Sequence, residues 1–152
     1  MKIKLSQALK EKNRLAGHLS RLQNILIREN TRRSDNPSKV ERDKVWAEIQ
    51  AVSDSLGVLK AAIATANVPI YPAIERLAEL KSRISYVNNL PKRDTPELQF
   101  VGRDQEKIEY TWDPFITQSM CDKLIVEYQH QCDELQDKID TFNATTELTV
   151  TL

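Results

Sequence analysis

The sequence predicts a mainly α-helical protein, an antiparallel helical bundle or coiled-coil rod of about four helices with one inserted β-hairpin. Three observations predict this fold. Apolar residues recur at alternating steps of three and four in three separate segments, which is the spacing of a seam between packed helices. The 152 residues include only three glycines, and 29% are charged, as is typical of long helices. One segment between helices changes to a period of two, which indicates strands.

The three heptad segments predict helices over about residues 5–29, 38–67 and 114–144. Lys12 is the one charged seam residue, and its aliphatic stem can cover apolar surface. The connection between the first two helices is short, so we expect them to form an antiparallel hairpin, with the last helix alongside as a third strand of a rod. The seam residues are Leu5, Ala8, Lys12, Leu15, Leu19, Leu22 and Leu26; Val45, Ile49, Val52, Leu56, Leu59, Ile63 and Ala66; and Ile125, Tyr128, Cys132, Leu135, Ile139 and Phe142.

Local signals set the expected starts of the first two helices. Ser6 is a candidate N-cap for the first helix. For the second, Ser38 followed by Glu41 fits a capping box, and Asn36 before Pro37 is a competing start. The sequence leaves both starts of the second helix open.

Prolines mark the remaining helix ends. Pro69 ends the second helix, because proline cannot donate a helical hydrogen bond. Pro72 suits the first turn of a third, shorter helix over about 72–88, and Asp113 before Pro114 predicts the start of the last helix. The expected buried side of the third helix consists of Ile74, Leu77, Leu80, Ile84 and Val87.

The segment over about 97–112 is the predicted antiparallel β-hairpin. Apolar residues alternate with polar ones in two runs, and residues 102–106 separate the runs as a turn. A lone two-stranded hairpin is marginal in water, so it must rest on the helices or pair with another subunit. Phe100, Tyr110 and Trp112 are therefore the expected oligomer interface, with packing inside the chain as the alternative.

Composition limits the classes of partner. Lys plus Arg equals Asp plus Glu, at 22 each, so no basic excess is available for binding nucleic acid non-specifically, and near-zero net charge is compatible with self-association. No run has the length needed to span a bilayer, and the N-terminus lacks the apolar stretch of a signal peptide. We therefore expect a single cytoplasmic domain over 1–152 that forms a homo-oligomer, without nucleic acid or membrane as a partner.

Few residues suggest chemistry. Cys121 and Cys132 lie about 16 Å apart along one predicted helix, too far for a disulfide, and are expected to be reduced. Cys132 is a seam residue and His130 lies off that face, so a core cysteine and a solvated histidine are expected rather than a metal pair. No catalytic set, cofactor site or metal site is expected, and the sequence predicts no enzyme.

A group of cations surrounds the connection between the first two helices, diluted by neighbouring carboxylates. The sequence leaves two interpretations open, a solvated end of the helical rod or a contact for a phosphate or an acidic partner. The cations are Arg28, Arg32, Arg33, Lys39 and Arg42.

Four stretches resemble septicolysin-like proteins, a family of mostly uncharacterised bacterial helical proteins. They are the opening over 1–9, the end of the second helix over 63–67, the segment 73–81, and the close over 143–148. The resemblance implies the same order of helices along nearly the whole chain, and the family's name implies a cytolysin. It supplies no catalytic residues.

The helices joined through a hairpin are also similar in architecture to prefoldin-like chaperone subunits. Taken together, the sequence predicts a non-enzymatic, self-associating helical scaffold or interaction protein, and it leaves open an unidentified protein partner. A membrane-active, pore-forming protein and a prefoldin-like chaperone module are the alternatives.

Overall fold

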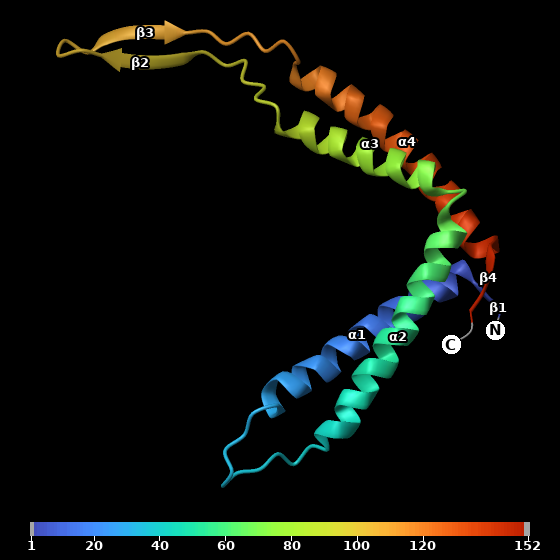
Figure 1. The fold of residues 1–152 in the computed structure, drawn as a ribbon. Helices are drawn as coiled ribbons and strands as arrows, with labels where there is room; N and C mark the ends of the chain where they lie inside the picture. The colour runs from blue at the N-terminus through green and yellow to red at the C-terminus, as the bar shows by residue number, and fades with distance from the viewer. Residues whose placement is uncertain (1, 151–152) are drawn as a thin grey trace. The chain divides into compact units, whose positions relative to one another are not determined.

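The computed structural model describes residues 2–150. Over these residues it is mainly helical, with two small antiparallel sheets, and this confirms the predicted fold class (Figure 1). The elements in chain order are β1 (Lys2–Lys4), α1 (Leu5–Glu29), α2 (Arg42–Asn67), α3 (Tyr71–Asn89), β2 (Glu97–Val101), β3 (Glu106–Tyr110), α4 (Gln118–Thr145) and β4 (Glu147–Thr149).

The chain divides into two compact units. The first consists of residues 1–71 and 139–152, and the second of residues 72–138. The first unit therefore holds α1, α2, the small β1–β4 sheet and the last turns of α4, and the second holds α3, the β2–β3 hairpin and most of α4.

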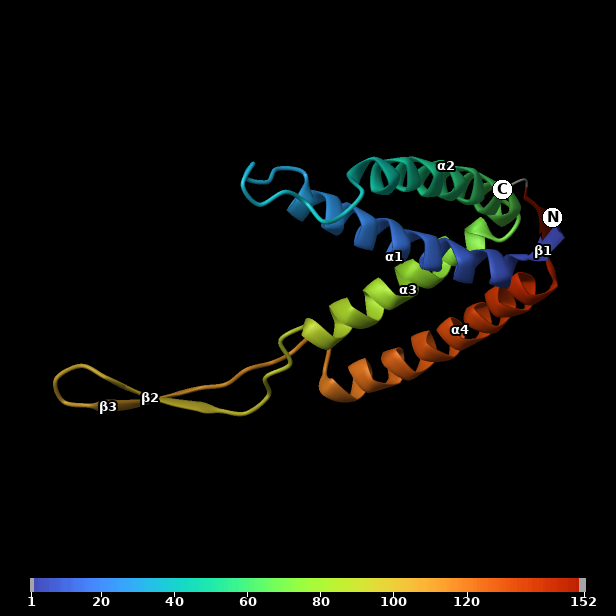
Figure 2. The ribbon, with the colours of Figure 1, turned by 90° about the horizontal axis from the view of Figure 1, so that it is seen from below.

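The first unit is built on the predicted helical hairpin, in which α1 and α2 lie side by side (Figures 1 and 2). Its core cluster draws on both seams and on the C-terminal tail, and all predicted seam residues of these two helices are buried or half-buried. Phe142 of α4 packs against this cluster. The buried members of the cluster are Leu5, Ala8, Leu15, Leu56, Leu59, Ile63, Leu148 and Val150.

The β1–β4 sheet brings the two ends of the chain together, and the sequence did not predict it. Ile3 pairs with Leu148 in an antiparallel register, and the Leu5 amide donates to the Thr146 carbonyl at 2.8 Å. Side chains alternate between the two faces of a strand, and in β4 the Leu148 side chain is the one that is buried in the core.

The second unit pairs α3 with the first part of α4. The Cys121 thiol of α4 lies 3.8 Å from the Val87 carbonyl of α3, and the predicted apolar side of α3 is buried or half-buried. We expected α4 to lie alongside α1 and α2 as the third helix of a rod. This expectation was wrong, because residues 118–138 belong to the same compact unit as α3. The seam of α4 is nevertheless correct, since each of its residues is buried or half-buried.

The first helix begins at Leu5, as predicted, but its N-cap is Lys4 rather than Ser6, and the Gln7 side chain accepts the Lys4 amide at 3.2 Å. The starts of two other helices need correction. The last begins at Gln118 and not at Pro114, because the Thr117 hydroxyl oxygen accepts the Met120 amide at 3.2 Å.

The second helix begins at Arg42 rather than near residue 38. Ser38 does not act as its cap, because its hydroxyl donates to the Glu29 carboxylate at 2.7 Å and accepts the Val40 amide at 3.1 Å. The serine therefore ties the loop to the end of α1. Neither predicted start, at Ser38 or at Pro37, was correct.

Candidate interaction surfaces on the hairpin and the helix tip

The predicted hairpin is present, with β2 and β3 joined by residues 102–105. Gly102 has a φ of 82°, a left-handed conformation that glycine adopts without steric cost, and the Gln105 amide closes the turn on the Gly102 carbonyl at 3.3 Å. In both ribbon views the hairpin extends beyond the ends of α3 and α4 (Figures 1 and 2). Its two strands therefore depend mainly on each other.

The strand register divides the hairpin side chains between two faces, because directly paired residues share a face. The Phe100 face consists of Leu98, Phe100, Lys107 and Glu109. The Tyr110 face consists of Glu97, Gln99, Val101, Glu106, Ile108 and Tyr110. Both faces carry apolar side chains, so a single helix packed on one face would leave the other exposed.

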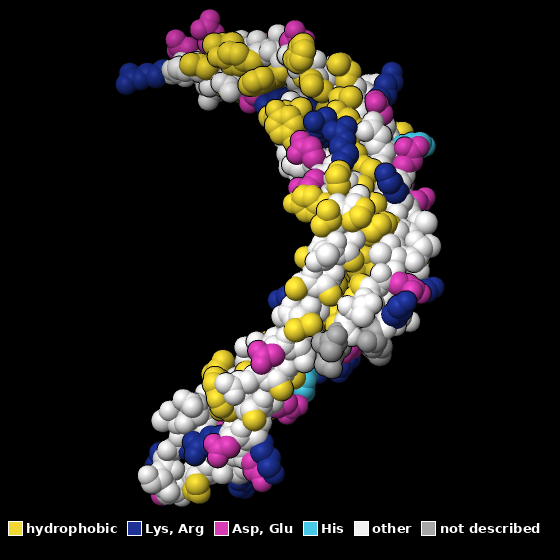
Figure 3. All heavy atoms as spheres, turned by 45° about the vertical axis from the view of Figure 1, so that its right-hand side comes forward, with side chains coloured by type: hydrophobic (Ala, Val, Ile, Leu, Met, Phe, Trp, Pro, Cys, Tyr) yellow, Lys and Arg dark blue, Asp and Glu magenta, His cyan; other side chains and the backbone are white. Residues whose placement is uncertain are grey.

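Large apolar side chains of the hairpin are exposed to solvent. Phe100 is 65% exposed, Trp112 49% and Tyr110 43%, and Leu98 and Val101 are exposed to a similar extent. The space-filling view shows hydrophobic side chains at the surface of the hairpin, with both acidic and basic side chains towards its turn (Figure 3). Clustered exposed apolar groups on a monomer indicate an interaction surface.

A cation lies over the Trp112 ring. The Arg93 guanidinium carbon lies 5.3 Å from the centroid of the Trp112 ring, and Arg93 also pairs with the Glu97 carboxylate at 2.7 Å. Glu97 belongs to the Tyr110 face, so Arg93 links Trp112 to that face. The structure thus associates Trp112 with Tyr110 and places Phe100 on the opposite face.

Sequence reasoning missed the role of Arg93. The residue lies in the linker before β2, where no periodic pattern exists. The signal that could have found it is a spacing of four between Arg93 and Glu97, close to the start of an aromatic strand.

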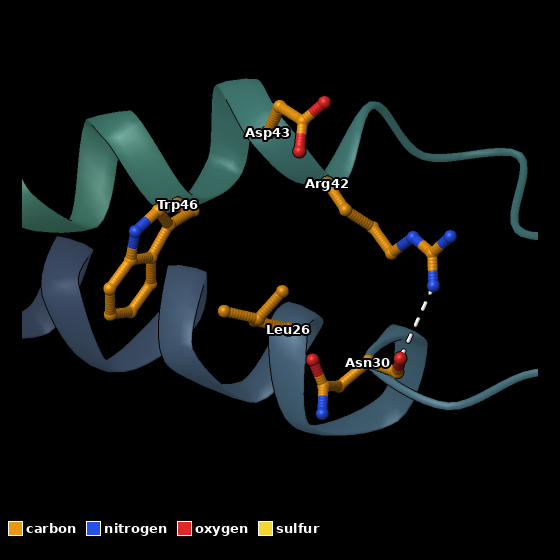
Figure 4. Close-up of a pocket in the computed structure, with 5 residues that line it drawn as sticks. All are labelled: Leu26, Asn30, Arg42, Asp43 and Trp46. Atoms are coloured by element: carbon orange, nitrogen blue, oxygen red, sulfur yellow. Dashed lines mark hydrogen bonds between the residues drawn. The ribbon is translucent and has the colours of Figure 1, made fainter.

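The second candidate surface is the helix tip, which we define as residues 21–46. These residues are the last turns of α1, the connecting loop and the first turns of α2. Arg42 crosses between the helices, and its guanidinium donates to the Asn30 carbonyl at 3.2 Å (Figure 4). It thereby satisfies a carbonyl at the C-terminal end of α1, where a cation is also favoured by the helix dipole.

The carboxylate of Glu29 is the most strongly bound acid of the helix tip. Arg32 donates to it through two nitrogens, at 2.5 and 3.0 Å, and Ser38 donates to it at 2.7 Å. The Arg32 hydrogen bonds, followed by that of Ser38, lower the pKa of Glu29 to about 2. These bonds fix the loop against the end of α1.

An open groove lies between the two helices at the tip. One part, about 450 Å³, is lined by Leu26, Asn30, Arg42, Asp43 and Trp46, and Figure 4 shows Leu26 and Trp46 between the two helix backbones. A neighbouring part, about 520 Å³, adds Ile27, which is 75% exposed. The groove therefore combines exposed apolar side chains with a cation at its edge.

The remaining residues with chemical potential are not among those that make up these surfaces. Cys121 and Cys132 are free, and Cys132 is buried as its seam position predicted; Cys121 is buried as well. The His130 side chain is 74% exposed and lies 3.5 Å from the Glu134 carboxylate. His18 instead bridges α1 and α2 through Glu48 at 2.9 Å. Over residues 2–150, no three His, Cys, Asp or Glu side chains lie close enough together to hold a metal ion.

Across the described part of the chain, no single helix has both the length and the apolar content needed to cross a membrane; α2 and α3 reach that threshold only when counted together across the bend between them.

We find no match to this chain among known family models, characterised proteins or solved structures.

Proposed function

We propose that this chain is a non-enzymatic helical scaffold that associates with copies of itself through the β2–β3 hairpin. The observation that carries the proposal is the exposure of Phe100, Tyr110 and Trp112 on a hairpin that extends beyond its supporting helices. A two-stranded sheet of this size is marginal in water, and both of its outer edges carry unpaired backbone groups. Association would bury the aromatic groups and stabilise the strands.

The contact between Arg93 and Trp112 supports the same proposal. A cation over the ring favours one placement of the tryptophan, and tryptophan and arginine are common anchors of interfaces. The proposal includes a cytoplasmic location, which the two free, buried cysteines support.

The resemblance to septicolysin-like proteins supplies only an order of helices to this proposal, and we propose no cytolytic activity from it.

The test combines Tyr110→Ser with Trp112→Ala and measures molecular mass by size-exclusion chromatography with light scattering. We expect a smaller species than the wild type, with an unchanged helical circular-dichroism signal. Val126→Ser is the control, because Val126 is apolar and 71% exposed but lies on α4, away from the hairpin. A wild-type chain that is monomeric at micromolar concentration would refute self-association, and an intact oligomer in the double variant would refute its placement on the hairpin.

A further inference from the structure

Formal charge is divided unequally between the two units. The first unit has thirteen Lys and Arg against nine Asp and Glu, and the second has nine against thirteen. The zero net charge of the chain therefore conceals an excess of four positive charges in one unit and four negative charges in the other.

The excesses are concentrated on the two candidate surfaces. The helix tip, residues 21–46, has seven cations and four carboxylates, and the hairpin with its flanks, residues 93–113, has three cations and six carboxylates. The helix tip therefore carries a formal charge of +3 and the hairpin segment a charge of −3. Charges of opposite sign on two surfaces guide and orient their association.

Ion pairs do not cancel the charge of the helix tip. Three of its cations pair with local carboxylates, namely Arg32 with Glu29, Arg33 with Asp35, and Lys44 with Glu41. Among the described residues the other four have no ion pair. Arg28 and Arg42 donate only to backbone carbonyls, and no partner is seen for Arg21 or Lys39.

The Tyr110 face of the hairpin suits this basic surface better than the Phe100 face. Its charged strand residues are Glu97, whose carboxylate pairs with Arg93, and Glu106, which has no ion pair among the described residues. The Phe100 face is electrically balanced, because it carries both Lys107 and Glu109. The Tyr110 face also carries the apolar groups that could enter the groove beside Trp46.

Two Tyr110 faces do not suit each other. A symmetric contact between them would bring together two faces that each carry the unpaired Glu106 carboxylate, and juxtaposing like charges is unfavourable. A contact between the hairpin of one copy and the helix tip of another avoids this repulsion. It also covers the exposed side chains of Ile27 and Trp46.

We propose that the Tyr110 face of one copy docks on the helix tip of a second copy. This inference rests on the proposed function, because it specifies which surface of the second copy receives the hairpin. Repetition of one such contact gives a two-fold pair, in which each copy gives and receives a hairpin, a closed ring or an open filament.

The test uses two charge reversals and a matched control for each. Glu106→Lys changes the Tyr110 face, and Glu109→Lys is its control, because both are exposed, unpaired residues of β3 on opposite faces. Arg28→Glu changes the helix tip, and Lys60→Glu is its control on an exposed part of α2 outside the tip. Lys39→Glu is a second tip variant, in the loop, for use if Arg28→Glu lowers the helical signal.

Association is measured by light scattering over a concentration series. We expect Glu106→Lys alone and Arg28→Glu alone to weaken association at least about tenfold, because each brings like charges together. The controls should change it by less than about twofold. An equimolar mixture of the two reversed variants should recover association, since the reversed hairpin of one fits the reversed tip of the other.

Each other outcome has a separate meaning. If the wild type is monomeric, the proposed function fails together with this inference. If Tyr110→Ser with Trp112→Ala abolishes association but Arg28→Glu and Lys39→Glu do not weaken it, the hairpin is the interface and the helix tip is not its receptor. If the mixture fails to recover association while its components remain folded, the inference is also overturned.

Discussion

Substitution of Leu59 by alanine tests whether the seam between α1 and α2 is the stabilising core. Leu59 has no exposed surface, and it packs in a cluster that includes Leu5 of α1 and Leu148 of β4. The cluster draws on three elements, α1, α2 and β4, so we expect the space left by the substitution to close only in part. Leu→Ala changes at such sites cost about 3 to 5 kcal/mol. For a chain of this length, the loss corresponds to a fall in Tm of roughly 6 to 20 °C.

Val58→Ala is the matched control for Leu59→Ala. Val58 is the preceding residue of the same helix and is 47% exposed, so its substitution should change the free energy of unfolding by less than about 0.5 kcal/mol. Urea unfolding is followed by circular dichroism and by the fluorescence of Trp46 in a Trp112→Phe background, which leaves one tryptophan, in the first unit. Equal midpoints for the two variants would refute the assignment of Leu59 to the core.

Three further predictions concern other parts of the chain. Leu135 is only half-buried, so Leu135→Ala should lower stability by roughly half as much as Leu59→Ala in the same urea assay. The pKa of Glu29 is about 2 in the folded chain against an ordinary 4.5, so the contribution of Glu29 to stability is present above about pH 4.5 and is lost as the pH falls towards 2. Glu29→Gln should therefore flatten the dependence of Tm on pH over this interval, and an unchanged pH profile would contradict the hydrogen bonds that Arg32 and Ser38 donate to Glu29. Gly102→Val should destabilise the hairpin by about 1 to 2 kcal/mol, because Gly102 has a φ of 82°, which valine adopts only with strain. Proteolysis within residues 97–110 should become faster, while the helical circular-dichroism signal stays unchanged.

The helices could be predicted because the spacing of apolar residues repeats along each of them. Each seam provides six or seven apolar positions at one spacing, and α1 ends at Glu29 as predicted. Helix starts were less predictable, because a single side chain decides them. Ser38 has the residue type of a cap but bonds to Glu29, nine residues earlier, and Thr117 replaces the expected cap at Asp113. Sequence spacing does not show which of several hydroxyls meets a free amide.

Pairing between segments that are distant in the chain could not be predicted from the sequence either. Each strand of the β1–β4 sheet has three residues, and Ile3 and Leu148 stand at opposite ends of the chain, so no local pattern joins them. The hairpin was predicted correctly because its strands are neighbours in sequence. Its two faces follow from the register, and this separates Phe100 from the other two aromatic residues of the expected interface.

The division of charge between the units predicts how salt acts on association. The sequence, with 22 charges of each sign, suggested only that copies would not repel one another. A contact between surfaces of charge −3 and +3 is attractive beyond this, and its attraction is screened as the Debye length falls from about 10 Å at 0.1 M salt to about 3 Å at 1 M. A contact between two Phe100 faces would depend mainly on apolar burial and would respond little. We therefore expect the dissociation constant of the wild-type oligomer to rise about tenfold or more between 0.05 and 0.5 M sodium chloride. A dissociation constant that is unchanged or falls over this range would show that apolar burial, rather than charge, determines which surface binds the hairpin.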